Sequence, residues 1–105
     1  GLVELARRFS RDRRILVLED AAYRELRYDG PPLPAVKSFD PTNEWVAYTT
    51  TFSKPCAPGL KTGYALLPRE LADAAGRLKA NHDFGSAHLP QVILDRLLAG
   101  GAYDR

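Results

Sequence analysis

Two short polar segments, residues 20–23 and 51–54, carry the side chains that could do chemistry in this sequence. Each segment follows a run of apolar or β-branched residues that is typical of a strand. The amine of Lys54 could form a Schiff base with an aldehyde or ketone, and the carboxylate of Asp20 could favour the protonated form of a nearby nitrogen. In open α/β sheets, ligands bind outside the carboxyl ends of the strands. If the two strands are parallel neighbours, Asp20 and Lys54 would therefore face one crevice.

The residues before these segments predict the strands that would position them. Residues 15–18 (Ile-Leu-Val-Leu) are continuously apolar, which predicts a strand buried on both faces, as in a parallel sheet covered by helices. Residues 45–51 are β-branched and aromatic and predict a second strand. Between the two strands we expect a short helical turn over residues 21–27 and a loop over residues 32–43, which are rich in Pro, Ser, Asp and Thr.

Helices and a third strand complete the prediction. Apolar residues at helical spacing predict an amphipathic helix over residues 2–12. Residues 62–67 predict a third strand, and Pro68 then suits the first turn of a helix with Leu71, Ala72, Ala75 and Leu78 as its apolar stripe. A last helix is predicted from Pro90 to the glycine pair at residues 100–101. This order favours an α/β layered fold.

Composition excludes several classes of protein. Of 105 residues, 45% are hydrophobic and 27% charged, and the net charge of +2 is too small to indicate a nucleic-acid or anionic-membrane partner. The one dense basic group, at residues 7, 8, 11, 13 and 14, is interpreted as a solvated face. A single cysteine, Cys56, excludes an intrachain disulfide and a cysteine-based metal site, and favours a cytoplasmic location. No apolar run is long enough to span a membrane.

Residues 51–64, Thr-Phe-Ser-Lys-Pro-Cys-Ala-Pro-Gly-Leu-Lys-Thr-Gly-Tyr, resemble the lysine motif of pyridoxal-phosphate (PLP) enzymes of fold type I. That motif reads S/T-F-S-K, three variable residues, then P-G-L-R-x-G-Y or F. Residues 20–23, Asp-Ala-Ala-Tyr, are similar to the D-x-x-Y segment of the same family. Both motifs occur in the family's order, and the resemblance covers nearly the whole chain. It points to the class I/II aminotransferases, in the branch that includes aminoadipate, kynurenine and aromatic aminotransferases.

The resemblance implies a role for each site residue. Lys54 would hold PLP as a Schiff base and then act as general acid and base, which requires a partly desolvated amine. Asp20 would pair with the pyridine nitrogen and keep the ring protonated. Tyr23 would hydrogen-bond the phenolic oxygen. The phosphate would be bound by Thr51, Ser53 and Lys61.

Each of these residues also has a purely structural interpretation. Lys54 could be a surface lysine after a strand, Asp20 a helix cap and Tyr23 a core aromatic. Thr51 could reflect β-propensity and Ser53 a turn. Lys61 departs from the family, which usually has arginine at this position, and lysine keeps the charge without the planar bidentate contact. We therefore expect phosphate binding to survive with looser cofactor retention.

The resemblance also implies what lies outside residues 1–105. We expect this chain to be part of the PLP-binding large domain, with a mostly parallel sheet flanked by helices and an antiparallel last strand. The family's phosphate loop, ring-stacking aromatic and substrate-carboxylate arginine are missing, so we expect this piece alone to be inactive. The full-length protein is expected to be a homodimer acting on an amino acid and a 2-oxo acid. The alternatives are another PLP reaction, such as that of a lyase or decarboxylase, and a PLP-sensing transcriptional regulator that would also bind nucleic acid.

Overall fold

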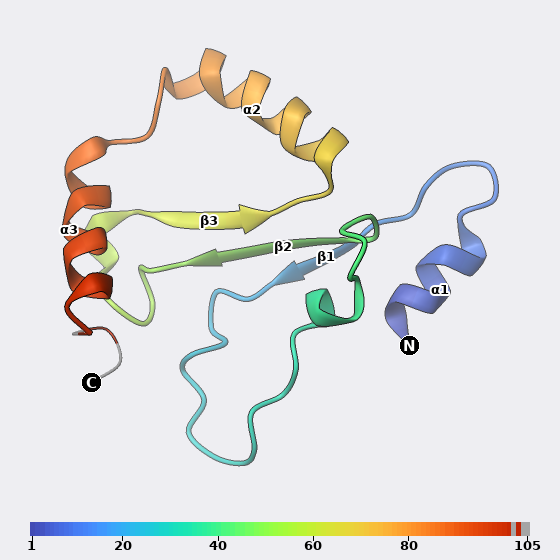
Figure 1. The fold of residues 1–105 in the computed structure, drawn as a ribbon, viewed down its shortest axis with the longest axis horizontal. Helices are drawn as coiled ribbons and strands as arrows, with labels where there is room; N and C mark the ends of the chain where they lie inside the picture. Colours follow the sequence, from blue (N-terminus) through green and yellow to red (C-terminus); the bar gives the residue numbers. More distant parts are fainter. Residues whose placement is uncertain (102, 104–105) are drawn as a thin grey trace.

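The computed structural model describes residues 1–101 and 103, and it contains a three-stranded mixed sheet with helices around it (Figure 1). The order of elements is α1 (Leu2–Phe9), β1 (Val17–Asp20), the 3-10 helix η1 (Val36–Phe39), β2 (Val46–Thr51), the 3-10 helix η2 (Pro58–Leu60), β3 (Gly63–Leu66), α2 (Arg69–Asp83) and α3 (His88–Ala99). Strand β2 is central and pairs in parallel with β1 and antiparallel with β3. The predicted α/β class and the antiparallel last strand are therefore confirmed.

The first strand begins at Val17, two residues after the start predicted for residues 15–18. It is also less buried than predicted. Pairing begins at Val17, whose N–H donates to the Trp45 carbonyl at 2.9 Å, and it continues to Asp20. The side chains of β1 alternate between half-buried and exposed, and Leu18 is 69% exposed. Strand β1 lies at the edge of the sheet, and the Leu18 side chain is left open to solvent there. An apolar run in the sequence does not show which side chains an edge strand leaves exposed.

Helix α1 ends at Phe9, three residues before the predicted end. The Ser10 hydroxyl donates to the Ala6 carbonyl at 2.7 Å and accepts the Ile15 N–H at 2.8 Å. A short hydroxyl side chain thus competes with the helical hydrogen bonds and turns the chain toward β1. The turn predicted over residues 21–27 is present, but it does not become a helix. The 3-10 helix η1 was not predicted, and α3 begins two residues before Pro90.

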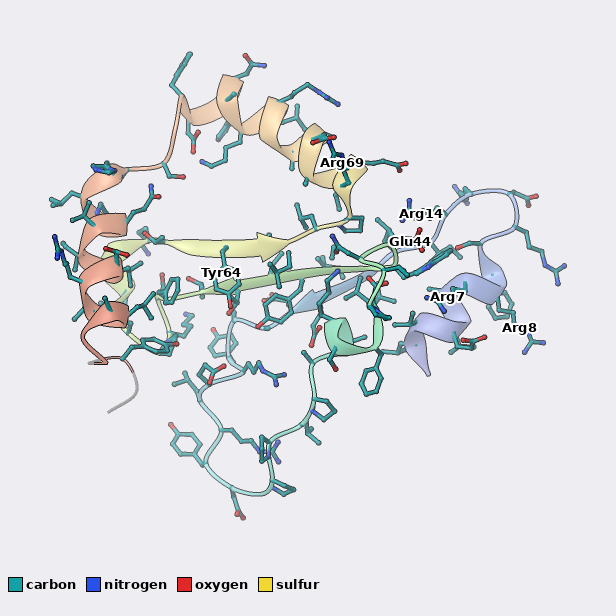
Figure 2. All side chains as sticks on the ribbon, in the orientation of Figure 1. Arg7, Arg8, Arg14, Glu44, Tyr64 and Arg69 are labelled. Carbon is teal, nitrogen blue, oxygen red and sulfur yellow. The ribbon has the colours of Figure 1, made fainter. Side chains whose placement is uncertain are left out.

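The five arginines before β1 are exposed, as predicted, but two of them also make specific contacts. The guanidinium groups of Arg7 and Arg14 lie 5.8 and 5.5 Å from the centroid of the Trp45 ring. Arg14 also forms an ion pair with Glu70 at 3.2 Å and donates to the Glu44 carbonyl. Figure 2 shows Arg7, Arg14 and Glu44 at the same end of the sheet, near α1. These contacts join α1, the start of β2 and α2.

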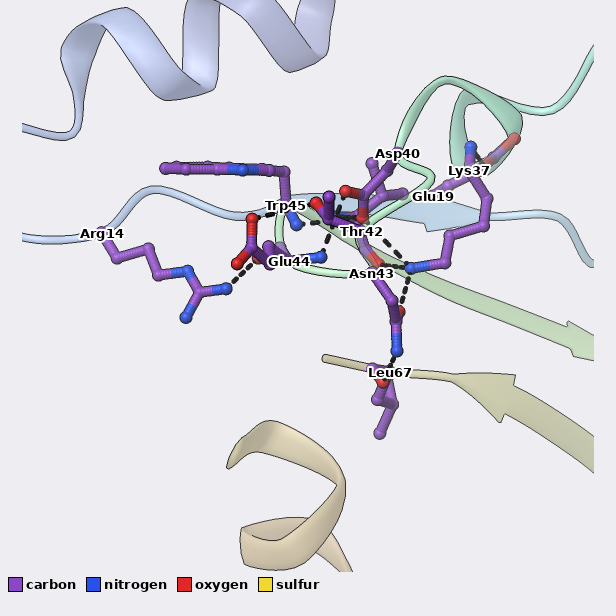
Figure 3. A network of polar contacts seen from close by, with 10 residues as sticks. Arg14, Glu19, Lys37, Asp40, Thr42, Asn43, Glu44, Trp45 and Leu67 are labelled. Atoms are coloured by element: carbon purple, nitrogen blue, oxygen red, sulfur yellow. Dashed lines mark hydrogen bonds and ion pairs between the residues drawn. The ribbon is translucent and has the colours of Figure 1, made fainter. Parts of the chain in front are cut away.

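A buried carboxylate fixes the start of β2 (Figure 3). Asp40 is 3% exposed and accepts the backbone N–H groups of Glu44, Trp45 and Val46 at 2.9 to 3.1 Å, and the Lys37 ammonium at 3.2 Å. Burial raises the pKa of Asp40, but these four donors outweigh it and lower the pKa to about 2. The sequence placed this residue in a loop, and its structural role was not predicted.

The hydrophobic core is small, and the chain is flat. Apart from Pro68, seven hydrophobic residues in the described part of the chain are buried: Val3, Ala6, Ala21, Val46, Ala47, Tyr48 and Leu94. The chain measures 45 × 42 × 19 Å, and its radius of gyration is 16.0 Å, against about 13 Å for a compact domain of this length. The predicted apolar stripe of α2 does not pack against a core, and no residue of α2 is buried. Within the described part of the chain, no helix has the length and apolar character that crossing a membrane requires.

Candidate functional site

Lys54 and Tyr23 lie together beyond the carboxyl ends of β2 and β1. The Lys54 ammonium is 5.1 Å from the centroid of the Tyr23 ring, a cation–π contact between residues that are 31 positions apart. Both side chains are exposed, Tyr23 by 64%. Tyr23 is therefore not a core aromatic. The desolvation expected around Lys54 is not provided by the described residues of this chain.

Asp20 ends β1 on the same side of the sheet. Its Cα lies opposite that of Thr49 in the parallel register, and the Ala21 N–H extends the pairing with a 2.8 Å bond to the Thr49 carbonyl. Asp20 Oδ1 accepts the Ala22 N–H at 3.1 Å, so the carboxylate does have a local turn role. In residues 1–101 and 103, its second oxygen accepts no hydrogen bond. The expected parallel pairing is confirmed, and it brings Asp20 to the end of the sheet at which Lys54 lies.

The loop that carries Lys54 is closed at its neck by two hydrogen bonds. The Thr62 carbonyl accepts the Phe52 N–H at 2.9 Å and the Thr51 hydroxyl at 3.2 Å. The Thr51 hydroxyl also accepts the Ser53 N–H at 3.1 Å. The proton of Thr51 is thus already used within the protein. The Ser53 hydroxyl, by contrast, has no partner among the described residues.

Lys61 lies at this neck, next to Thr62. Its backbone is left-handed, with φ 47° and ψ 34°, a conformation that is uncommon for a residue with a side chain. Its side chain is exposed and forms no ion pair with the described residues. Lys61 and Ser53 therefore lie near the two ends of one short loop, each with a polar group that no described residue binds.

Gly63 permits the close approach of β3 to β2. A Cβ atom at this position would lie 2.3 Å from the Thr50 carbonyl oxygen, closer than any real contact. The backbones of β2 and β3 therefore approach each other too closely at Gly63 for any side chain. This close approach holds the return strand, and with it the neck of the Lys54 loop, against β2.

An aromatic group supports the loop from β2 and β3. The Tyr64 ring lies 6.3 Å from that of Tyr48 and 5.9 Å from that of Phe52, and Figure 2 shows its position on the strands. Burial, and the charge that Tyr64 would carry when ionised, raise the pKa of the buried Tyr48. Tyr48 therefore stays neutral and acts as packing. The ring contact with Tyr64 thus packs Phe52, at the start of the Lys54 loop, against the strands.

A further contact joins the two polar segments and was missed by the sequence reasoning. The Thr50 hydroxyl donates to the Ala21 carbonyl at 3.2 Å. Thr49, Thr50 and Thr51 form a run at the end of β2, and alternation along a strand puts Thr50 on the opposite face from its neighbours. The run of threonines is evident in the sequence, but the sequence does not predict the hydrogen-bond partner of each hydroxyl.

The described residues contain no group of three or more His, Cys, Asp or Glu side chains that could hold a metal ion. The site instead presents an amine, a phenol and a carboxylate outside parallel strands, beside a hydroxyl and an ammonium on a short loop. Such a donor set is able to bind an aldehyde, a protonated ring nitrogen and an anion.

Comparison with known proteins gives this geometry a context. The family model "Aminotransferase class I and II" matches residues 2–100. An uncharacterised aminotransferase of Saccharolobus solfataricus is 35% identical over 92 residues, which are 88% of this chain and 22% of the relative. The HTH-type transcriptional regulator NorG of Staphylococcus aureus is 27% identical over 97 residues, which are 92% of this chain and 22% of that protein.

A solved structure matches as well. LysN, the α-aminoadipate aminotransferase of Thermus thermophilus, was crystallised with N-(5'-phosphopyridoxyl)-L-leucine. It superposes with a TM-score of 0.85 at 27% identity, over 98% of this chain and 26% of LysN. The chain thus spans about a fifth of the curated relatives cited above and about a quarter of this structure.

Proposed function

The chain belongs to the class I and II aminotransferase family, and we propose that the full-length protein is a PLP-dependent aminotransferase that moves an amino group from an amino acid to a 2-oxo acid. The observation that carries the proposal is the contact between Lys54 and Tyr23, 5.1 Å apart, beside Asp20 at the carboxyl ends of two parallel strands. Two motifs far apart in the sequence thus meet where α/β sheets bind ligands.

The chemistry of the residues fits each part of PLP. The Lys54 amine suits the aldehyde, the Asp20 carboxylate the ring nitrogen and the Tyr23 hydroxyl the phenolic oxygen. Ser53 and Lys61 suit the phosphate. Thr51 belongs to the same set, although it would have to release the Thr62 carbonyl to donate its proton.

When bound, PLP supplies an aldehyde that accepts the amino group and a ring that takes up electron density. The residues of this chain would do the remaining work. Lys54 Nζ would take a proton from the α-carbon of the amino acid as a general base, and would deliver it as a general acid to the cofactor carbon that carried the aldehyde. Asp20 would keep the ring nitrogen protonated, because a nearby carboxylate favours the charged form of that group.

We also propose that this chain is one part of a large cofactor-binding domain in a cytoplasmic homodimer. Its flat shape and its many exposed apolar side chains support further covering segments, since an independent domain would bury more of them. The family's substrate-carboxylate arginine would then come from outside residues 1–105. The isolated chain is therefore expected to show no turnover.

The test is a half-reaction with the full-length, PLP-loaded protein. α-Aminoadipate, the substrate in the name of LysN, heads a panel of amino donors. Addition of the correct donor should change the visible absorbance of the cofactor, and a 2-oxo acid should restore it. Lys54→Ala should abolish both changes. A loaded wild-type protein that responds to no donor in the panel would argue against an aminotransferase.

A PLP-sensing transcriptional regulator is the second candidate. It is favoured by the match to NorG and by that to a probable regulatory protein of rhizopine catabolism from Rhizobium meliloti, which is 34% identical over 83 residues. These 83 residues are 79% of this chain and 16% of that relative. Under this alternative, the full-length protein would bind DNA in a PLP-dependent manner without turning over amino acids. A winged-helix segment in the full reading frame, with DNA binding in a mobility-shift assay, would support it.

A further inference from the structure

Thr50 connects the two motifs of the site through its side chain. It lies four residues before Lys54, and its hydroxyl donates to the Ala21 carbonyl at 3.2 Å. Ala21 immediately follows Asp20 and lies two residues before Tyr23. This hydrogen bond is thus a direct tie between the strand that leads to Lys54 and the turn that carries Asp20 and Tyr23.

The burial and hydrogen bonds of Ala21 make its position depend on β2. It is 7% exposed, so its carbonyl is largely shielded from water that could replace a lost hydroxyl. Its N–H donates to the Thr49 carbonyl at 2.8 Å, and its carbonyl also accepts the Arg24 N–H at 3.1 Å. The N–H of Ala21 therefore binds β2, and its carbonyl binds both β2, through Thr50, and the turn that contains Tyr23.

We propose that Thr50 is a positioning residue, whose hydroxyl sets the placement of Asp20 and Tyr23 relative to Lys54 and thereby tunes the bound cofactor. This inference rests on the proposed PLP chemistry. A placement role follows because the Thr50 hydroxyl donates to the Ala21 carbonyl, between Asp20 and Tyr23, and forms no hydrogen bond with Lys54 or Asp20 among the described residues. Its loss would let the turn move relative to β2 while the strand pairing remains.

The test compares Thr50→Val, which keeps the shape and removes the hydroxyl, with Thr50→Ser, which keeps the hydroxyl. Thr49→Val is the matched control, because Thr49 also binds Ala21, but through its backbone carbonyl, and its side chain makes no hydrogen bond with the described residues. The readouts on full-length protein are the pH midpoint of the visible absorbance of bound PLP, the rate of PLP dissociation, and kcat and KM. A purely structural role would lower the melting temperature without moving the pH midpoint.

Thr50→Val is expected to move the midpoint by about 0.5 pH unit and to speed PLP dissociation about fivefold, as the loss of one shielded neutral hydrogen bond predicts. Thr50→Ser should restore both values, and Thr49→Val should leave them unchanged. If Thr50→Val does not fold, Thr50→Ala gives the same comparison. An unchanged midpoint and dissociation rate in PLP-loaded Thr50→Val or Thr50→Ala would overturn this inference and leave the proposed function standing. A wild-type protein that binds no PLP would instead overturn the proposed function.

Discussion

Replacing Asp40 by Asn should weaken the start of β2, because the carboxylate is the hub of a buried network. Asp40 accepts three backbone N–H groups and the Lys37 ammonium. An amide of the same shape would turn an NH2 group toward some of these donors and remove the charge that pairs with Lys37. Breaking a buried, hydrogen-bonded charge in this way is strongly destabilising.

The size of the effect follows from the pKa. The folded value of about 2 lies about 1.8 units below the ordinary value of 3.8, and each unit corresponds to about 1.4 kcal/mol. The ionised Asp40 therefore contributes on the order of 2 kcal/mol at pH 7. Because folding lowers the pKa, this contribution is complete above about pH 5 and is lost as the pH falls through 3.8 toward 2.

The assay is hydrogen–deuterium exchange of the peptide containing residues 44–46 in the full-length protein, combined with urea unfolding. At pH 7, Asp40→Asn should speed exchange of these amides by about 30-fold and lower the unfolding free energy by about 2 kcal/mol. Near pH 3, the difference in unfolding free energy between wild type and variant should shrink to roughly half. The control is Asp73→Asn on the exposed side of α2, where little change is expected. Equal exchange in wild type and Asp40→Asn at pH 7 would refute the reasoning.

Three further predictions concern the site. Gly63→Ala should destabilise the protein by about 2 kcal/mol or more, because the new Cβ would meet the Thr50 carbonyl, whereas Gly76→Ala in open space on α2 should be neutral or stabilising; equal melting temperatures for the two variants would contradict this. Lys61→Arg should slow PLP dissociation about threefold or more by adding a bidentate phosphate contact, and unchanged retention would count against Lys61 as a phosphate ligand. Tyr23→Phe keeps the ring over Lys54 but removes the hydroxyl, so PLP affinity should fall about tenfold; an unaltered affinity would remove Tyr23 from the cofactor contacts.

Local patterns in the sequence were enough to predict the parts of the fold that depend on neighbours along the chain. The β-branched run before Phe52 predicted β2 to within one residue, and Pro68 placed the start of α2 correctly. The apolar first strand and the family resemblance predicted a mostly parallel sheet, and the parallel pairing of β1 with β2 agrees with it. These features depend on backbone propensity and strand order, which short segments encode.

Features that no helix or strand pattern encodes were not predictable. Asp40 looked like one polar loop residue among several; Lys37 and Val46 are near it in the sequence, but only the folded loop brings them to its buried carboxylate. Leu18 looked buried, but its exposure depends on what covers the edge strand. The hydroxyl of Thr50 has a partner 29 positions away, and no local pattern specifies such a pair.

Trapping of the cofactor on Lys54 tests the central claim most directly. The full-length protein would be loaded with PLP, reduced with borohydride, digested and mapped by mass spectrometry. Borohydride reduction turns the linkage between an amine and PLP into a stable pyridoxyl group. The account predicts one pyridoxyl group on the peptide containing Lys54, and none on that peptide in the Lys54→Ala variant. A label on another lysine such as Lys61, or no label in a protein saturated with PLP, would contradict it.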